Sequence, residues 1–216
     1  TGGDEGSAGP AEQVCQEIRA AGGEAASNSD SVTDYKSVQR MVEQAKDTFG
    51  GLHAIVNPAG ILRDTMFHKM TAQQWNEVIN TNLNSLFNMT QPIWGGMRDR
   101  SFGRVICISS INGQKGQMGQ ANYSAAKAGD IGFVKALAQE GAAKGITVNA
   151  ICPGYIGTDM VKAIKPEILD KIVATIPVKR LGTPEEIGSI VGWLAGDESG
   201  FTTGADFSCN GGLHMG

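Results

Sequence analysis

The sequence has no run of lysines and arginines and no apolar segment longer than a strand. With a net charge of −4, it carries no basic footprint of the kind that binds nucleic acid. No segment is long enough to span a membrane, and no signal peptide is visible. These absences predict a cytoplasmic protein that has neither nucleic acid nor a membrane as its partner.

Cysteines are also few. The four of them lie far apart and form no Cys-x-x-Cys pair: Cys15, Cys107, Cys152 and Cys209. Zinc sites and disulfide frameworks need cysteines that are clustered or regularly spaced. We therefore expect small buried thiols, with no metal site and no disulfide.

The composition is that of an ordinary globular protein. Of the 216 residues, 41% are apolar and 19% are charged, which suits one domain with a core large enough to be stable alone. The 30 glycines fall mostly between periodic segments, where they indicate turns. Because there is no internal repeat and no linker, residues 1–216 are predicted to form a single domain.

Helical and strand-like segments alternate along the chain. Apolar residues follow helical spacing from Ala11 and again from Asp34 to Phe49, and each stretch ends at glycines. Two further helices begin with capping boxes, at Thr71 and at Thr183. Between the helices lie apolar runs of strand length, at residues 52–56, 104–108 and 146–151. This alternation predicts an α/β fold with a Rossmann-like, doubly wound parallel sheet.

One part of such a fold has no counterpart in the sequence. Dinucleotide-binding sheets place a glycine-rich turn between the first strand and the first helix, where backbone N–H groups meet the pyrophosphate. The stretch Thr1 to Gly9 is rich in glycine, but no strand precedes it, so we interpret Thr1 to Pro10 as a loop. The fold is therefore expected to lack its N-terminal strand, glycine turn, helix and second strand, about 30 residues on ordinary element lengths.

Tyr123 and Lys127 stand four residues apart near the start of a predicted helix. This spacing places both side chains on one face, one turn apart. An ammonium beside a phenol favours the phenolate, and a shift of about 3 pKa units, or roughly 4 kcal/mol, brings a phenol into the range of acid–base catalysis at neutral pH. The alternative interpretation is an ordinary helix surface, with a solvated lysine beside a half-buried tyrosine.

Ser110 gives this pair a context. Ser109 and Ser110 close the strand at 104–108, and parallel sheets bind ligands at the carboxyl ends of their strands. Ser110 precedes Tyr123 by 13 residues (123 − 110), across a loop rich in glycine and glutamine. A hydroxyl at this place can hold a substrate carbonyl while Tyr123 donates a proton to it. The alternative is a serine that only forms a turn.

The order of these residues resembles the short-chain dehydrogenase/reductase family. A strand that ends in two serines and is followed by Tyr-x-x-x-Lys is typical of that family, and three further motifs agree. They are Asn57-Pro58-Ala59-Gly60, similar to the family's Asn-Asn-Ala-Gly, then Asn82 in a helix, and the turn at Pro153-Gly154. Pro58 departs from the pattern, because it removes a backbone donor and pushes Asn57 toward an extended conformation.

The resemblance implies a nicotinamide-dependent oxidoreductase with four catalytic residues. Tyr123 is then the acid, Lys127 assists it and holds the nicotinamide ribose, and Ser110 orients the carbonyl. Asn82 holds a water that links Lys127 to bulk solvent. Besides Tyr123 and Lys127, the implied cofactor contacts are Asn57, Ala59, Gly60, Ile61, Pro153, Gly154, Ile156 and Thr158. NADP(H) is the expected cofactor. NAD(H) stays open as the alternative, because the residue that discriminates the two cofactors lies at the end of the second strand, where this sequence begins.

Within the family, the surroundings of the site resemble the acetoacetyl-CoA reductases. Residues 110–123, 153–160, 171–181 and 204–216 carry this resemblance. It implies the NADPH-dependent reduction of acetoacetyl-CoA, a short 3-ketoacyl-CoA, to the (R)-3-hydroxyacyl-CoA used in polyhydroxybutyrate synthesis. Besides Ser110 and Tyr123, the implied substrate contacts are Asp64, Gln117, Gln120, Gly154, Tyr155 and Lys165. Without the resemblance, Gln117 and Gln120 are equally well explained as solvated loop residues.

Two other functions fit the same residues. A 3-oxoacyl-acyl-carrier-protein reductase uses the same chemistry and needs a basic surface near the pocket mouth, which the sequence does not locate. A non-catalytic relative would account for Pro58 and for the absent phosphate-binding turn, but it would not require all four catalytic positions.

The resemblance also implies a homotetramer. In the family, the helices that correspond to Thr71–Met97 and Asn122–Ala143 pair across subunits, and the C-terminal segment makes a second contact. Core packing within one chain explains the same apolar faces.

The segment Gly9 to Gly60 resembles a different group, the reductase domains of multifunctional fatty-acid oxidation enzymes and their actinobacterial relatives. Divergence and a spliced or engineered chain both account for that difference between the halves.

Overall fold

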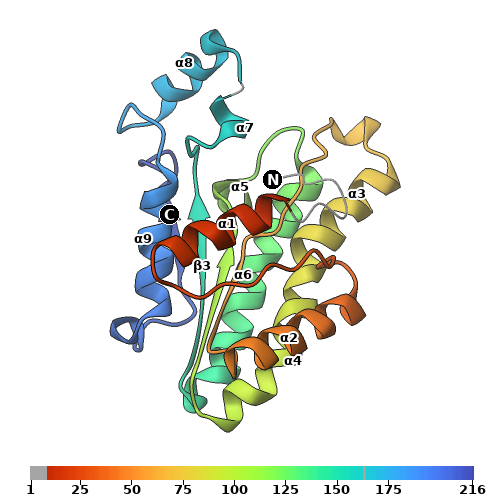
Figure 1. Ribbon diagram of the computed structural model, residues 1–216. Coiled ribbons are helices and arrows are strands. Elements are labelled where there is room, and N and C mark those ends of the chain that lie inside the picture. The colour runs from red at the N-terminus through yellow and green to blue at the C-terminus, as the bar shows by residue number, and fades with distance from the viewer. Residues whose placement is uncertain (1–8, 163) are drawn as a thin grey trace.

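A parallel sheet forms the centre of the computed structural model, which describes residues 9–162 and 164–216 (Figure 1). Within these residues the sheet has four strands, in the order β1 (Ala54–Asn57), β2 (Gly103–Ile108), β3 (Ile146–Pro153) and β4 (Asp206–Cys209). All neighbouring strands are parallel, so every connection crosses over through helical segments. The Rossmann-like α/β class predicted from the sequence is confirmed.

Helices cover both faces of this sheet. The first face carries α2 (Tyr35–Phe49), α4 (Ser85–Asp99) and α6 (Ala121–Gly141). The second face carries α9 (Pro184–Ala195). Along β2, Val105 and Cys107 enter the core on the first face while Ile106 enters the core on the second, because successive strand residues point to opposite sides. The doubly wound arrangement follows from these two cores.

The predicted strands are confirmed with shifted ends. β1 begins and ends later than the apolar run at 52–56, and β3 continues past Ile151 to Pro153. β4 was not predicted. Its apolar residues Phe207 and Cys209 alternate with polar ones over only four positions, which is too short a stretch for periodicity to distinguish from a loop.

The predicted helix ends are largely confirmed. Asp34 caps α2 by accepting a hydrogen bond from the backbone N–H of Ser37 at 2.9 Å, and Gly50 ends that helix with a φ of 78°. A capping box begins α9, as predicted. The helix α1 (Gly9–Ala20) differs, because Gly9 and Pro10 belong to it rather than to a loop. Proline suits the first turn of a helix, where its missing N–H has no partner to lose. The glycine-rich stretch from Thr1 to Ala8 lies outside the described residues.

The helix predicted from Thr71 onward is interrupted. α3 (Ala72–Ile79) begins with the predicted capping box, but a π-helical turn, η2 (Asn80–Asn84), separates it from α4. Single π turns inside α-helices are frequent at functional sites. This one contains Asn82, one of the four predicted catalytic residues.

Short elements complete the connections between the strands. They are η1 (Phe67–Lys69), α5 (Ile111–Lys115), η3 (Ala142–Lys144), α7 (Asp159–Lys162), α8 (Pro166–Thr175) and η4 (Asp197–Ser199). Figure 1 shows α7 and α8 standing beyond the body of the sheet, at the end toward which β3 runs. This is also the end at which parallel sheets bind ligands.

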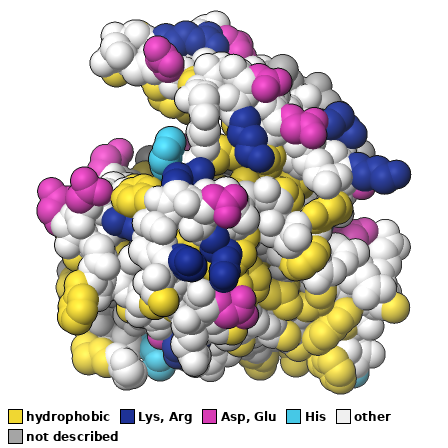
Figure 2. Space-filling view, turned by 90° about the horizontal axis from the view of Figure 1, so that it is seen from below, with side chains coloured by type: hydrophobic (Ala, Val, Ile, Leu, Met, Phe, Trp, Pro, Cys, Tyr) yellow, Lys and Arg dark blue, Asp and Glu magenta, His cyan; other side chains and the backbone are white. Residues whose placement is uncertain are grey.

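The surface carries charges of both signs. On the face shown in Figure 2, basic and acidic side chains are interspersed, with apolar areas between them. This mixture agrees with the absence of a basic footprint in the sequence. Among the described residues, no helix has the length and apolar character needed to cross a membrane.

Candidate active site

The carboxyl ends of the strands bring together the motifs that the sequence singled out. Because β1, β2 and β3 are parallel, Asn57 and Pro153, which end β1 and β3, lie at the same edge of the sheet as Ser110, which follows the end of β2. Ser110 is buried and caps α5, where its hydroxyl oxygen accepts a hydrogen bond from the N–H of Asn112 at 3.1 Å. The hydroxyl hydrogen therefore stays available to a ligand.

Tyr123 and Lys127 lie on α6 as predicted, one turn apart. The ammonium nitrogen of Lys127 is 5.9 Å from the centroid of the Tyr123 ring. Tyr123 is half-buried, whereas Lys127 is only 3% exposed, which is unusual for a lysine. The burial decides against a solvated lysine, which was the alternative interpretation of this pair.

Lys127 connects the helix α6 to the end of β2 through two hydrogen bonds. Its ammonium donates to the carbonyl oxygen of Ile108 at 2.7 Å, and its backbone carbonyl accepts from the hydroxyl of Ser109 at 2.7 Å. Gly113 on α5 adds a third constraint, because a β-carbon there would lie 2.6 Å from the carbonyl carbon of Lys127. Ser110 and Tyr123 are therefore held in a fixed relation. The role of Gly113 was not predicted from the sequence, and the feature that could have indicated it is a glycine three residues after Ser110.

A buried carboxylate, Asp130, completes the surroundings of Lys127. Its Oδ2 lies 3.1 Å from the ammonium nitrogen, and the two side chains are 4% (Lys127) and 1% (Asp130) exposed. Burial raises the pKa of Asp130 to about 6, against the opposing attraction of Lys127. The sequence reasoning missed this residue also, although its spacing of three from Lys127 on a helix predicts contact.

Asn82 is fully buried in the π turn and binds the segment that follows β1. Its carbonyl oxygen accepts from the N–H of Ile61 at 2.9 Å, and its amide donates to the carbonyl of Ile61 at 3.2 Å. Gly60 packs against the same amide, since a β-carbon there would lie 3.4 Å from Nδ2. Asn82 thus fixes Gly60 and Ile61, two of the predicted cofactor contacts, and its role in holding a water stays a prediction.

At the end of β1, the backbone has the conformation that was predicted from the sequence. Asn57 is extended as the last residue of the strand, which is the conformation that Pro58 requires of it. Its amide lies 4.0 Å from the Cys107 sulfur on β2. Burial raises the pKa of the Cys107 thiol to about 12, so this cysteine is protonated and inert at neutral pH. The next residues, Pro58 and Ala59, form no regular structure.

Three of the polar residues around Ser110 form a chain of hydrogen bonds. Asn112 donates to the carbonyl oxygen of Gln120 at 2.8 Å, and the amide of Gln120 donates to Asp64 at 2.7 Å. Asp64 and Gln120, both predicted substrate contacts, are therefore joined to Ser110 through Asn112, a residue that the sequence reasoning missed. Gln117 is exposed and accepts a hydrogen bond from Lys115 at 3.1 Å. The solvated-loop interpretation describes Gln117 better than it describes Gln120.

The turn after β3 brings the remaining predicted cofactor contacts to this edge of the sheet. The N–H of Gly154 donates to the carbonyl of Cys209 at 2.9 Å, and a β-carbon on Gly154 would lie 2.8 Å from Cα of Asn210. Only glycine fits this approach. Ile156 forms a parallel bridge with Gly182, and the N–H of Thr158 donates to the carbonyl of Ile156 at 2.7 Å.

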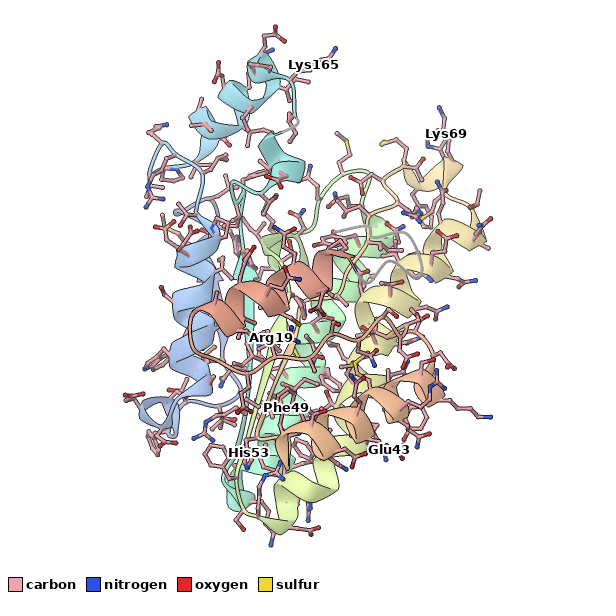
Figure 3. All side chains as sticks on the ribbon, viewed as in Figure 1. Arg19, Glu43, Phe49, His53, Lys69 and Lys165 are labelled. Atoms are coloured by element: carbon pink, nitrogen blue, oxygen red, sulfur yellow. The ribbon has the colours of Figure 1, made fainter. Side chains whose placement is uncertain are left out.

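The two remaining substrate candidates lie apart from this chain of polar residues. Tyr155 lines a cavity of about 370 Å³ between the turn and α9, together with Arg180, Glu186 and Asn210. Ser110, Tyr123 and Lys127 do not line it. Lys165 is exposed at the start of α8, and Figure 3 shows it at the outer end of that helix.

The described residues hold no group of three or more His, Cys, Asp or Glu side chains that could bind a metal ion. Three of the four cysteines, Cys15, Cys107 and Cys152, are buried, as expected. Cys209 is half-buried.

Comparison with known proteins identifies the class. The family model described as enoyl-(acyl carrier protein) reductase matches residues 6–214. The chain belongs to the short-chain dehydrogenase/reductase family, and it is an oxidoreductase.

Individual relatives within this family are named for more specific activities. The chain is 65% identical over 182 residues to an acetoacetyl-CoA reductase of Shinella zoogloeoides, covering 84% of this chain and 76% of that protein. It is 57% identical over 205 residues to an acetoacetyl-CoA reductase of Cupriavidus necator, covering 95% of this chain and 83% of the relative. The second match therefore extends into the segment Gly9 to Gly60. A 3-oxoacyl-[acyl-carrier-protein] reductase of Vibrio cholerae is 42% identical over 184 residues, covering 85% of this chain and 75% of that protein.

Family membership implies a nicotinamide cofactor, and the residues present fit one. An ammonium has three N–H donors, and Lys127 uses two of them on Ile108 and Asp130. The third is available to a ribose hydroxyl.

Proposed function

We propose that this chain catalyses the NADPH-dependent reduction of acetoacetyl-CoA to the (R)-3-hydroxyacyl-CoA. The observation that carries the proposal is the buried Lys127 beside Tyr123, fastened to the strand end that presents Ser110. The substrate is supported by the two relatives named acetoacetyl-CoA reductase, at 65% and 57% identity.

Each residue of the site has its own role in the proposed reaction. A reduced nicotinamide, whose ribose Lys127 would hold, would supply a hydride with its electron pair to the carbonyl carbon and would itself be oxidised. Tyr123 donates its phenolic proton to the carbonyl oxygen, so that the ketone becomes an alcohol. Ser110 donates a hydrogen bond to the same oxygen and orients it. Lys127 stabilises the phenolate that remains on Tyr123 until a proton from solvent restores the phenol.

Polar side chains select which carbonyl of the substrate reacts. A β-ketoacyl thioester carries two carbonyl groups, and amide donors can fix the one that faces Tyr123. Gln120 is the strongest candidate, because its amide is positioned by Asn112 and Asp64. Gln117, Tyr155 and Lys165 remain proposed contacts from outside this group, and we propose that Lys165, at the start of the projecting α8, meets the CoA moiety.

A second candidate function is 3-oxoacyl-acyl-carrier-protein reductase, which the Vibrio cholerae relative supports. Initial rates with acetoacetyl-CoA and with acetoacetyl carrier protein, each with NADPH and with NADH, separate the two. We expect kcat/KM to be at least about tenfold higher for the CoA thioester and for NADPH, a difference of about 1.4 kcal/mol in transition-state stabilisation. Higher kcat/KM with the carrier-bound substrate would select the second function. No turnover with any pair would contradict both proposed substrates.

We also propose that the chain forms a homotetramer. Helices α4 and α6 present apolar side chains to solvent around a hollow of about 260 Å³, among them Phe87, Trp94 and Phe133. Phe87 is 56% exposed, and exposed apolar patches of this kind mark interfaces. Sedimentation of the wild-type chain should give four times the mass of one subunit, and Phe133→Glu should lower it. A wild-type monomer would contradict the proposal.

A further inference from the structure

Asp130 forms a buried ion pair with Lys127, and packing alone does not explain it. One carboxylate oxygen lies 3.1 Å from the ammonium nitrogen. The other, Oδ1, is also buried and has no hydrogen-bond partner among the residues that the structure describes. A buried carboxylate with an unpartnered oxygen costs stability, and an apolar side chain would fill the same space without that cost. Such a cost suggests that the carboxylate serves the site.

Among the residues that the structure describes, Lys127 is the charged group that pairs with Asp130. It lies on the same helix, and from β2 and β3 the thiols of Cys107 and Cys152 approach Asp130. Burial raises the pKa values of these thiols to about 12 and about 11, with the negative charge of Asp130 adding to the effect. Both thiols are thus neutral at physiological pH.

On the other described elements packed against α6, the charged groups have partners of their own or are exposed. On α5, Lys115 donates to Gln117, and on α3, Glu77 pairs with Arg63 at 2.7 Å. On η3, Lys144 is exposed, and η2 has no titratable residue. The charge on Asp130 is therefore balanced by Lys127.

We propose that Asp130 is a positioning residue that acts on Tyr123 through Lys127. Its carboxylate holds the ammonium and cancels part of its positive charge, so the phenol keeps its proton to a higher pH than it would beside an unpaired ammonium. A protonated phenol is the form that reduces a ketone, so Asp130 biases the site toward reduction. This inference rests on the proposed function, because it takes Tyr123 to be the acid.

The physical reason lies in the net charge of the pair. With Asp130 ionised, Lys127 and Asp130 together carry no net charge, and they favour the phenolate less than a lone ammonium does. At an effective dielectric constant near 20, one unit charge about 12 Å away changes a titration by about one pH unit. Asp130 follows Tyr123 by seven residues on α6 (130 − 123), which is a rise of about 10.5 Å along the helix, so its charge acts on the phenol over about this distance.

Asp130→Asn tests the inference, because it removes the charge and keeps the size. The kcat for acetoacetyl-CoA reduction is measured from about pH 6 to about pH 10, and so is the kcat for the reverse oxidation of the alcohol. We expect the alkaline fall of the reduction rate to move down by about one pH unit, and the rise of the oxidation rate to move down by the same amount. Asp130→Glu, which restores a carboxylate, should move both limbs back toward the wild type. Asp99→Asn, an exposed carboxylate at the end of α4, is the matched control and should move neither.

A titration that needs no turnover keeps this inference separate from the proposed function. The ultraviolet absorbance of tyrosinate, taken as the difference between proteins with and without Tyr123, reports the ionisation of that phenol directly. It should occur at lower pH in the Asp130→Asn background than in the wild type, whether or not acetoacetyl-CoA is the substrate. Circular dichroism checks folding, and Asp130→Ser takes the place of the amide variant if that variant does not fold. Rates that fall without a shift of either limb, together with an unchanged tyrosinate titration, would show a purely structural role and overturn the inference.

Discussion

Gly113 and Lys127 approach each other so closely that a β-carbon on Gly113 would lie 2.6 Å from the backbone carbonyl carbon of Lys127. This contact sets the distance between α5, which Ser110 caps, and α6, which carries Tyr123. Two neighbouring helices can pack this closely only where one of them has no side chain.

Gly113→Ala should therefore push α5 away from α6. We expect a loss of about 1 to 3 kcal/mol in the free energy of unfolding, as in other overpacked cores, and a fall in kcat of about tenfold or more because Ser110 and Tyr123 move apart. Denaturant unfolding and steady-state rates measure the two effects. Gly132→Ala on α6 is the control, since a β-carbon there meets nothing within 4 Å, and it should raise stability by about 0.5 to 1 kcal/mol. Equal behaviour of the two variants would show that the contact is not tight.

Asn82→Ala should loosen the segment that follows β1. It removes both hydrogen bonds to the backbone of Ile61, at a cost of about 2 kcal/mol in the free energy of unfolding. It should also raise the KM for the nicotinamide cofactor more than it lowers kcat, because Gly60 and Ile61 are proposed cofactor contacts. Asn84→Ala, an exposed amide in the same π turn that bonds to Asn80, is the control and should change neither quantity appreciably. A large fall in kcat with an unchanged KM would point instead to the predicted role of Asn82 in holding a catalytic water.

Glu186 should make α9 sensitive to acid. Its carboxylate accepts from Arg180 at 2.7 Å and from the backbone N–H of Thr183 at 2.8 Å, and these bonds lower its pKa to about 2. A carboxylate with a lowered pKa stabilises the fold above its ordinary pKa of 4.5, and this contribution is lost as the pH falls from there toward about 2.

The difference in unfolding free energy between wild type and Glu186→Gln should therefore be largest at neutral pH and shrink over that acidic range. Thermal unfolding at a series of pH values measures it. Glu185→Gln, which removes a charge from the same turn and leaves the capping box in place, is the control. A difference that stays constant with pH would contradict the assignment.

Sequence patterns predicted most of the architecture because the determinants are local. Capping boxes at Thr71 and Thr183 and the glycine after Phe49 act within one turn, so they mark helix ends without knowledge of the fold. The strands β2 and β3 are buried on both faces; β2 has the continuous apolar run Val105–Ile108, and β3 has Ile146, Val148, Ala150 and Ile151 around the polar Thr147 and Asn149. β4 escaped prediction because it is short and its pairing with β3 is a tertiary contact.

Some residues of the site could likewise be predicted from local sequence patterns, and others could not. Tyr123, Lys127 and Ser110 follow from spacing and from the strand end. Gly113 and Asp130 did not, because their importance depends on how α5, α6 and β2 approach one another. The π turn at Asn80–Asn84 was not predicted either, because it is a single turn between two α-helices and no residue type in it distinguishes it from α-helix.

The most direct test of the account is the rate of NADPH oxidation with acetoacetyl-CoA, compared between the wild type and Tyr123→Phe. This change removes the phenolic proton and keeps the ring, so circular dichroism and thermal unfolding should be nearly unchanged. We predict steady turnover by the wild type and a fall of about 10²-fold or more in kcat for the variant, because a positioned proton donor contributes about 10² to 10⁴ to the rate. A Tyr123→Phe protein that retains most of the wild-type rate would contradict the central claim that Tyr123 is the acid.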